Sequence, residues 1–346
     1  MTYIKSKKLQ KGDTVAIISP SWGGPSVFPK PYELGLKTLE EFGLKIKEFP
    51  SARKDADYNY NHPEFRAKDI NDAYADKDVK AIFSSIGGDD SIRILPYLDL
   101  EVIKNNPKPI MGYSDNTTLL TYINQQGIIT LHGPCIMAGL SQYHALEKSF
   151  QEHIKQLLLE NPENYSFHPY KKFNHGYPDW GKEKNIGKIK KTIKNKGWNW
   201  LQGDSVVKGI LYGGSFEVME FMKGTKYWPK KEFWNNKILF LETSEDKPSP
   251  SNVKWMLRNY GIQGIFDQIS ALLIGRPRDY SEEEVKELES NILNVVKNEF
   301  KNDTLPIVSN MDFGHTDPQW IIPLGIKAEV NCKDKTFKLK EKIFED

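Results

Sequence analysis

The chain has few of the features that would place it in a specialised class of protein. Only two of its 346 residues are cysteines, Cys135 and Cys332, and neither has a second Cys or His at metal-binding spacing. A disulfide framework and a zinc site are therefore not indicated. We expect neither a metal nor another cofactor.

Long apolar runs and an excess of one charge are also missing. The N-terminal segment has no apolar core, and nowhere do 18 apolar residues follow one another, which argues against export and against a membrane span. The 48 basic and 46 acidic side chains nearly balance, so the composition does not favour a nucleic-acid polymer or a membrane as partner. We expect a cytoplasmic protein that acts on a small molecule.

What is present is a globular composition with a regular alternation of short apolar runs and amphipathic stretches. Residues 14–19 and 79–84 are predicted strands, and helical patterns cover 31–42 and 64–74. Strands separated by helices imply βαβ units and a parallel sheet. We predict an α/β fold whose N-terminal domain, residues 1–160, is Rossmann-like or flavodoxin-like and carries the nucleophile.

The rest of the chain divides into two further parts. Residues 161–205 lose the alternation and are rich in polar residues, glycine and aromatics, which predicts a linker and active-site flap. Strand and helix patterns resume over 206–346, where we predict a smaller, mixed α/β domain. The cleft between the two domains is the expected site.

Ser114 lies in the segment Pro109-Ile-Met-Gly-Tyr-Ser-Asp-Asn-Thr117, where a short apolar run passes into a helical pattern. Gly112 permits a tight turn, and Asp115 to Thr117 suit a first helical turn. A serine at such a turn can act as a nucleophile, with N–H groups of the helix start binding an oxyanion. The alternative is that Ser114 only caps the helix, and this segment by itself favours the cap.

A nucleophilic serine needs a base, and His315 is the leading candidate. It follows the predicted strand 306–310 in an irregular loop, whereas His132, which follows a shorter strand, is the second candidate. Glu242 ends an apolar strand and can orient the imidazole, although it can also be an ordinary surface charge. Because Ser114, Glu242 and His315 each follow a buried-looking strand, we predict that they meet in one cleft.

The turn Gly87-Gly88-Asp89-Asp90 also follows a predicted strand. Glycine N–H groups there are unobstructed, so Gly88 and the N–H of Asp115 are candidate donors to an oxyanion. A plain turn and part of a phosphate-binding loop are the alternatives.

Six short motifs, taken in order, resemble the LD-carboxypeptidase family of serine peptidases, and within it most closely the microcin C immunity branch. The resemblance spans nearly the whole chain. It implies that Ser114 is the nucleophile, His315 the general base and Glu242 its orienting partner, in a homodimer with an acyl-enzyme mechanism. The motifs are Gly-Gly-Asp-Asp at 87–90, Gly-Tyr-Ser-Asp-x-Thr at 112–117, His-Gly-Pro at 132–134, Leu-Glu at 241–242, Gly-Arg-Pro at 275–277 and Gly-His-Thr-Asp-Pro at 314–318.

The same resemblance suggests substrates. Members of the immunity branch resemble aminoacyl-nucleotide hydrolases. The resemblance implies that Trp180 stacks on the adenine of the substrate and that Lys247 binds its phosphate. Asp89 and Ser215 are further predicted substrate contacts. Trp180 can instead anchor its loop, and Ser215 stands where this branch is expected to have asparagine.

Two other functions remain open. One is removal of the terminal D-alanine from a murein tetrapeptide, for which Arg276 or Lys247 would hold the carboxylate. The other is a non-catalytic small-molecule binding protein whose two domains close on a ligand.

Overall fold

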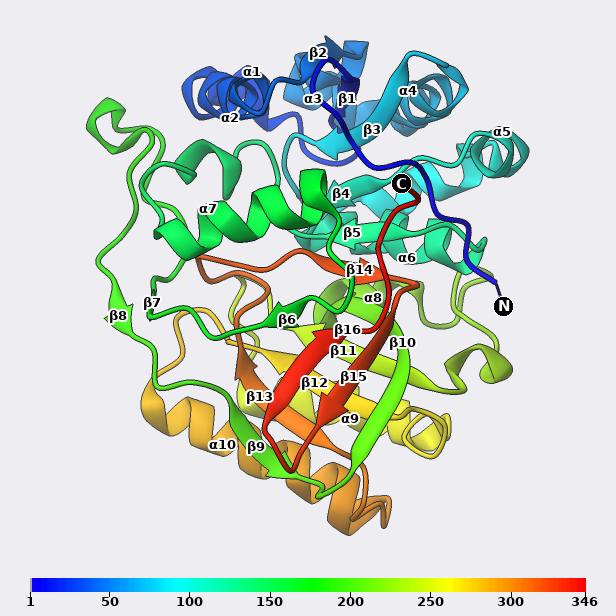
Figure 1. Ribbon diagram of the computed structural model, residues 1–346, viewed down its shortest axis with the longest axis vertical. Helices are drawn as coiled ribbons and strands as arrows, with labels where there is room; N and C mark the ends of the chain where they lie inside the picture. Colours follow the sequence, from blue (N-terminus) through cyan, green and yellow to red (C-terminus); the bar gives the residue numbers. More distant parts are fainter. Residues whose placement is uncertain (1) are drawn as a thin grey trace.

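The computed structural model describes residues 2–346, and its first β-sheet lies in the N-terminal half of the molecule (Figure 1). The strand order is β14-β5-β4-β3-β1-β2, in which neighbouring strands are parallel except for β14 and β5. The predicted parallel sheet is therefore confirmed. Its strands are β1 (Thr14–Ile18), β2 (Lys45–Glu48), β3 (Val79–Ser84), β4 (Ile110–Gly112), β5 (Thr130–His132) and β14 (Ile322–Leu324).

Helices connect these strands and cover the sheet. In α2, Pro29 occupies the first turn, where its missing N–H costs nothing, and Tyr32, Leu36 and Leu39 form a buried stripe. The helices of this half are α1 (Gly24–Val27), α2 (Pro29–Glu41), α3 (Ala56–Asn61), α4 (Pro63–Ala75), α5 (Leu100–Asn105), α6 (Thr117–Gln125) and α7 (Lys148–Lys155).

The second sheet has the order β6-β16-β15-β10-β11-β12-β13-β9. Its four central strands, β10 to β13, are parallel, and the strands on both sides of them run antiparallel. The predicted mixed α/β character of this half is confirmed. Its elements are β6 (Ser166–Phe167), β9 (Asn199–Gln202), β10 (Val206–Ser215), α8 (Phe216–Met222), β11 (Lys237–Glu242), α9 (Pro250–Ile262), β12 (Ala271–Gly275), α10 (Glu282–Leu293), β13 (Ile307–Met311), β15 (Lys327–Asn331) and β16 (Thr336–Leu339).

The segment 161–205 is more ordered than its sequence pattern indicates. Its two ends supply β6 and β9, which pair with β16 and β13 of the second sheet. Between them β7 (Lys172–Phe173) and β8 (Ile193–Lys194) pair with each other along one side of the molecule (Figure 1). The boundaries at 160 and 205 stay predictions.

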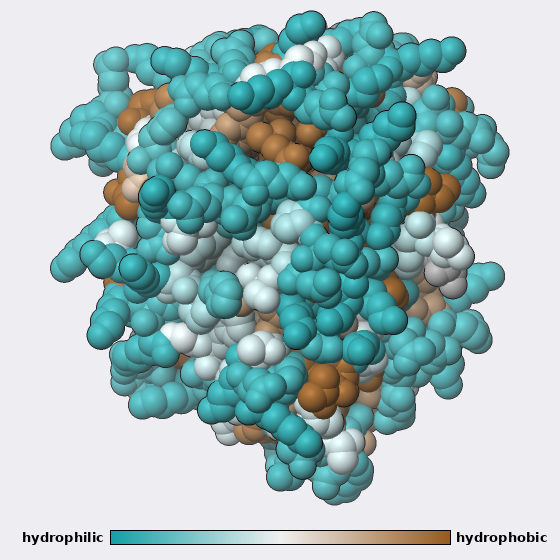
Figure 2. Space-filling view, viewed as in Figure 1, coloured by the Kyte–Doolittle hydropathy of each residue, from teal (hydrophilic) through white to brown (hydrophobic). Residues whose placement is uncertain are grey.

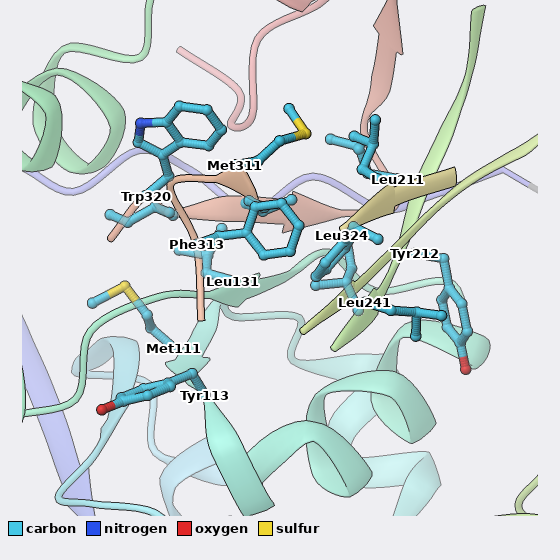
Figure 3. Packing of buried hydrophobic residues seen from close by; sticks show 14 of the residues in the cluster. Met111, Tyr113, Leu131, Leu211, Tyr212, Leu241, Met311, Phe313, Trp320 and Leu324 are labelled. Atoms are coloured by element: carbon cyan, nitrogen blue, oxygen red, sulfur yellow. The ribbon is translucent and has the colours of Figure 1, made fainter. Parts of the chain in front are cut away.

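The two sheets share one hydrophobic core. Side chains from the first sheet, such as Met111 and Leu131, gather with Phe313, Leu324 and Leu241 (Figure 3). All five are at most 2% exposed. Because β14 crosses back to pair with β5, the loop between β13 and β14, which contains His315, is held between the two sheets.

The face of the molecule seen in Figure 2 is mainly hydrophilic and has small hydrophobic patches. Within residues 2–346, none of the helices combines the length and the apolar character needed to cross a bilayer.

Candidate active site

Ser114 lies just beyond the carboxyl end of β4, in a short 3₁₀ turn that leads into α6. Its φ angle is 61°, a left-handed conformation that costs a non-glycine residue about 1–3 kcal/mol and that clusters at active sites. The start of α6 has no side-chain cap, so Ser114 does not serve as the helix cap. Its hydroxyl is directed to His315 instead.

Three side chains from separate parts of the chain form one hydrogen-bonded row. Ser114 Oγ lies 2.9 Å from His315 Nε2, and His315 Nδ1 lies 2.7 Å from Glu242 Oε2. Because a carboxylate only accepts, Nδ1 carries the hydrogen and Nε2 is free to accept from the serine hydroxyl. A hydroxyl, an imidazole and a carboxylate in this order are what a serine nucleophile requires.

Two glycines make this row possible. A Cβ at Gly314 would lie 2.6 Å from Glu242 Oε2, and one at Gly275 would lie 2.8 Å from Glu242 Cβ. Gly314 also has a φ of 94°, which glycine adopts without strain. The Gly-His and Gly-Arg motifs therefore leave room for a buried carboxylate.

The electrostatics of the row favour a strong base. Burial of the ring lowers the pKa of His315, but the adjacent Glu242 carboxylate, with smaller effects of Glu245 and Glu217, outweighs it and raises that pKa above its ordinary value. Glu242 is fully buried, which raises the pKa of its own carboxyl while His315 opposes the rise. A proton on the imidazole is thus stabilised by the adjacent carboxylate.

His132, the second candidate base, does not take part in this row. It ends β5 and is fully buried, and its two ring nitrogens have no hydrogen-bond partner in the described part of the chain. Burial lowers the pKa of His132 to about 3. The ring is therefore neutral and packs against Tyr113 and Phe240.

Ser114 opens onto a cleft of about 390 Å³ between the two halves of the molecule. Gly88 and Asp89, in the loop after β3, line it from the first half. From the second half come Glu217, at the start of α8, and the loop after β11. The complete lining is Ser21, Trp22, Ala56, Tyr60, Gly88, Asp89, Asp90, Ser114, Glu217, Val218, Phe221, Ser244, Glu245 and Asp246.

The turn at Gly87 and Gly88 packs directly against the serine. A Cβ at Gly87 would lie 3.1 Å from Ser114 Oγ and 3.5 Å from the backbone nitrogen of Asp115. The carboxylate of Asp115 accepts hydrogen bonds from Ser21 Oγ at 2.6 Å and from the N–H of Ser91 at 2.7 Å. These bonds fix the peptide that follows Ser114.

The other predicted substrate contacts do not line the cleft. Trp180 is 8% exposed, and its indole stacks on Tyr177 with centroids 4.0 Å apart, which fits the loop-anchor alternative. Lys247 Nζ lies 3.0 Å from Glu284 Oε1 on α10. Ser215 is buried at the end of β10. The substrate roles of these residues stay predictions.

Arg276, considered above as a carboxylate clamp, is buried in another network. It donates to Asn310 Oδ1 at 3.0 Å and to Asp312 Oδ1 at 2.8 Å, and its guanidinium lies over the ring of Phe173. These bonds give Arg276 a structural role.

Sequence reasoning missed Glu217 and Ser244, which line the cleft from the second half. The sequence contains one signal that a site residue follows β10. Gly213-Gly214-Ser215 ends a strand and is followed by a helix, and Gly112-Tyr113-Ser114 likewise stands between a strand and a helix. A carboxylate in the first turn of that second helix lies at the same edge of the fold as Ser114.

Two family models match most of the chain. The family model of the LD-carboxypeptidase N-terminal domain matches residues 15–133, and that of the LD-carboxypeptidase C-terminal domain matches residues 208–330. The chain belongs to the LD-carboxypeptidase family. The resemblance drawn from its motifs is confirmed, and the chain is a hydrolase of this peptidase family.

Individual relatives match nearly the full length of the chain. It is 28% identical to the microcin C7 self-immunity protein MccF of Escherichia coli, over 96% of this chain and 94% of that protein. It is 27% identical to a probable murein peptide carboxypeptidase of Bacillus subtilis, over 99% and 96%. A solved structure of MccF in complex with aspartyl sulfamoyl adenosine superposes with a TM-score of 0.88 at 26% identity, covering 99% of this chain and all of that one.

Proposed function

We propose that this chain is a serine amidase that hydrolyses the amide bond of peptidyl or aminoacyl nucleotides. The observation that carries the proposal is the hydrogen-bonded row Ser114–His315–Glu242 at the wall of the cleft. The likeness to MccF, one of whose structures contains aspartyl sulfamoyl adenosine, supports the choice of substrate.

The reaction follows from this geometry. His315 Nε2 takes the proton of Ser114 as Oγ forms a bond to the substrate carbonyl carbon, and the N–H groups of Gly88 and Asp115 stabilise the oxyanion. The C–N bond then breaks, and His315 returns the proton to the leaving nitrogen. Water, deprotonated by His315, attacks the acyl-enzyme, and the proton passes back to Ser114 as the acid leaves.

A second candidate is an LD-carboxypeptidase that removes D-alanine from a murein tetrapeptide. The family membership and the B. subtilis relative favour it. The same three residues would do the chemistry, and only the groups that bind the two sides of the scissile bond would differ.

The test is to offer the purified protein an aminoacyl sulfamoyl adenosine and a murein tetrapeptide in parallel, and to identify the products by mass spectrometry. We expect cleavage of the nucleotide analogue, unchanged by a chelator. Cleavage of the tetrapeptide alone would establish the second candidate. A fluorophosphonate probe should label the wild type and the surface variant Ser149→Ala, but not Ser114→Ala; labelling of Ser114→Ala would contradict the nucleophile.

The pH dependence tests the base. His315 accepts a proton only when neutral, so kcat/KM should fall as pH drops through its pKa, at a pH above the ordinary histidine value of about 6.5. In Glu242→Gln the residual activity should fall at a lower pH, because the carboxylate that raises this pKa is gone. Glu245→Gln should shift the profile less. An unshifted profile in Glu242→Gln would contradict the pairing.

The cytoplasmic location and the homodimer expected above stay predictions and form part of this proposal. Both are independent of the chemistry of the row.

A further inference from the structure

The charged side chains that line the cleft beside Ser114 are all acidic. Five carboxylates line it, and among residues 2–346 no lysine, arginine or histidine belongs to the lining. An anionic substrate group placed there would be repelled, while a cationic group would be attracted. The five are Asp89, Asp90, Glu217, Glu245 and Asp246.

Two of these carboxylates form ion pairs with arginines. Asp90 pairs with Arg66 and Arg93, and Glu245 pairs with Arg278. Among residues 2–346, Asp89, Glu217 and Asp246 form no ion pair with a basic side chain. The cleft therefore keeps a negative field of its own, which reaches His315 and helps to raise its pKa through Glu245 and Glu217.

Glu217 differs from Asp89 and Asp246, the other two carboxylates without an ion pair, because its carboxylate is held in place by hydrogen bonds. Its Oε1 accepts from the N–H of Ser244 at 2.9 Å and from Ser244 Oγ at 2.6 Å, while the N–H of Asp246 donates to that Oγ at 3.2 Å. Its Oε2 has only a long contact with Ser215 Oγ, at 3.4 Å. One oxygen is thus fixed by the protein, and the other has capacity to accept from a ligand.

The cleft wall around Glu217 also suits an aliphatic or flat substituent. Phe221, one turn further along α8, is 45% exposed, and Tyr60 from the first half is 56% exposed. An ammonium group on a short apolar arm would find both a carboxylate and apolar surface here.

We infer that Glu217 is a specificity-determining residue that binds a free ammonium group of the substrate. The inference rests on the proposed function, because it takes Ser114 as the nucleophile in the same cleft. In an aminoacyl or peptidyl substrate, the ammonium belongs to the acyl part, which lies beside Glu217. An anionic phosphoramidate or sulfamate then lies away from these carboxylates.

The experiment uses two fluorophosphonate probes that differ only in their arm, 4-aminobutyl in one and n-pentyl in the other. The rate of Ser114 labelling is measured with each probe at low ionic strength. For the wild type we expect the ammonium probe to react about tenfold faster, equivalent to about 1.4 kcal/mol. The ratio should fall as salt is added, since the groups involved are partly exposed.

Glu217→Gln is the informative variant, because glutamine has nearly the same shape as glutamate and retains an oxygen that can accept from Ser244. Its ratio of the two rates should fall to nearly one, and using the ratio cancels any change in the basicity of His315. Glu220→Gln makes the same charge change on α8, where Glu220 pairs with Lys223, and should keep the wild-type ratio.

The outcomes separate the two proposals. Labelling of Ser114 at equal rates by both probes in the wild type, or an unchanged ratio in Glu217→Gln, would overturn the role of Glu217 and leave the nucleophile intact. Labelling by neither probe would overturn the nucleophile, and with it this inference.

Discussion

Replacing Ser114 by alanine is expected to lower kcat for the amide substrate by about 10⁶-fold, a loss of about 8 kcal/mol of transition-state stabilisation. The alanine has no oxygen to attack the carbonyl, and His315 then has no proton to transfer. Neither His315 nor Glu242 can replace the serine as nucleophile. The Glu242 carboxylate is held behind the imidazole, with 2.7 Å between its Oε2 and His315 Nδ1. Single-turnover kinetics on wild type and variant measure the loss.

The same series distinguishes a triad from three unrelated residues. His315→Ala should cost nearly as much as Ser114→Ala, and the double variant should cost no more than either, because the two groups act as a unit. Glu242→Gln should cost about 10⁴-fold, since glutamine holds the imidazole in the wrong tautomer. Additive losses in the double variant would contradict the proposed mechanism.

The row of three residues could be predicted because strand ends are strong sequence signals. Ser114, Glu242 and His315 follow apolar runs that became β4, β11 and β13. The ends of β11 and β13 meet at one edge of the second sheet, so Glu242 and His315, 73 positions apart, could be expected to converge. Ser114 follows β4 of the first sheet, and its approach to His315, 201 positions away, depends on how the two sheets pack against each other. The short motifs then identified the family.

Long-range pairing and side-chain partners could not be predicted in the same way. The strand β14 is three residues long and pairs across the molecule with β5, which no local pattern indicates. The ion pair of Lys247 with Glu284 depends on how α10 packs, and the stacking of Trp180 on Tyr177 depends on how its loop folds. A sequence shows that such residues are available, but the tertiary structure decides which partner each one takes.

Breaking the buried ion pair between Arg276 and Asp312 is expected to cost more stability than breaking an exposed ion pair of the second half. The two side chains are 2% and 0% exposed, with 2.8 Å between Arg276 Nη2 and Asp312 Oδ1. Asp312 also accepts from Trp198 Nε1 at 2.9 Å and from Asn195 Nδ2 at 3.0 Å. One carboxylate therefore ties the segment 161–205 to the loop after β12.

Asp312→Asn should lower the free energy of unfolding by about 3–5 kcal/mol, because the buried guanidinium of Arg276 loses its counter-charge. Glu299→Gln is the matched control: it breaks the exposed pair of Glu299 with Arg258 and should cost at most about 1 kcal/mol. Urea unfolding followed by tryptophan fluorescence measures both. Equal losses in the two variants would show that burial does not set the strength of the Arg276 pair. A larger loss in Asp312→Asn, with segment 161–205 cut faster by protease, would show that this carboxylate holds the segment in place.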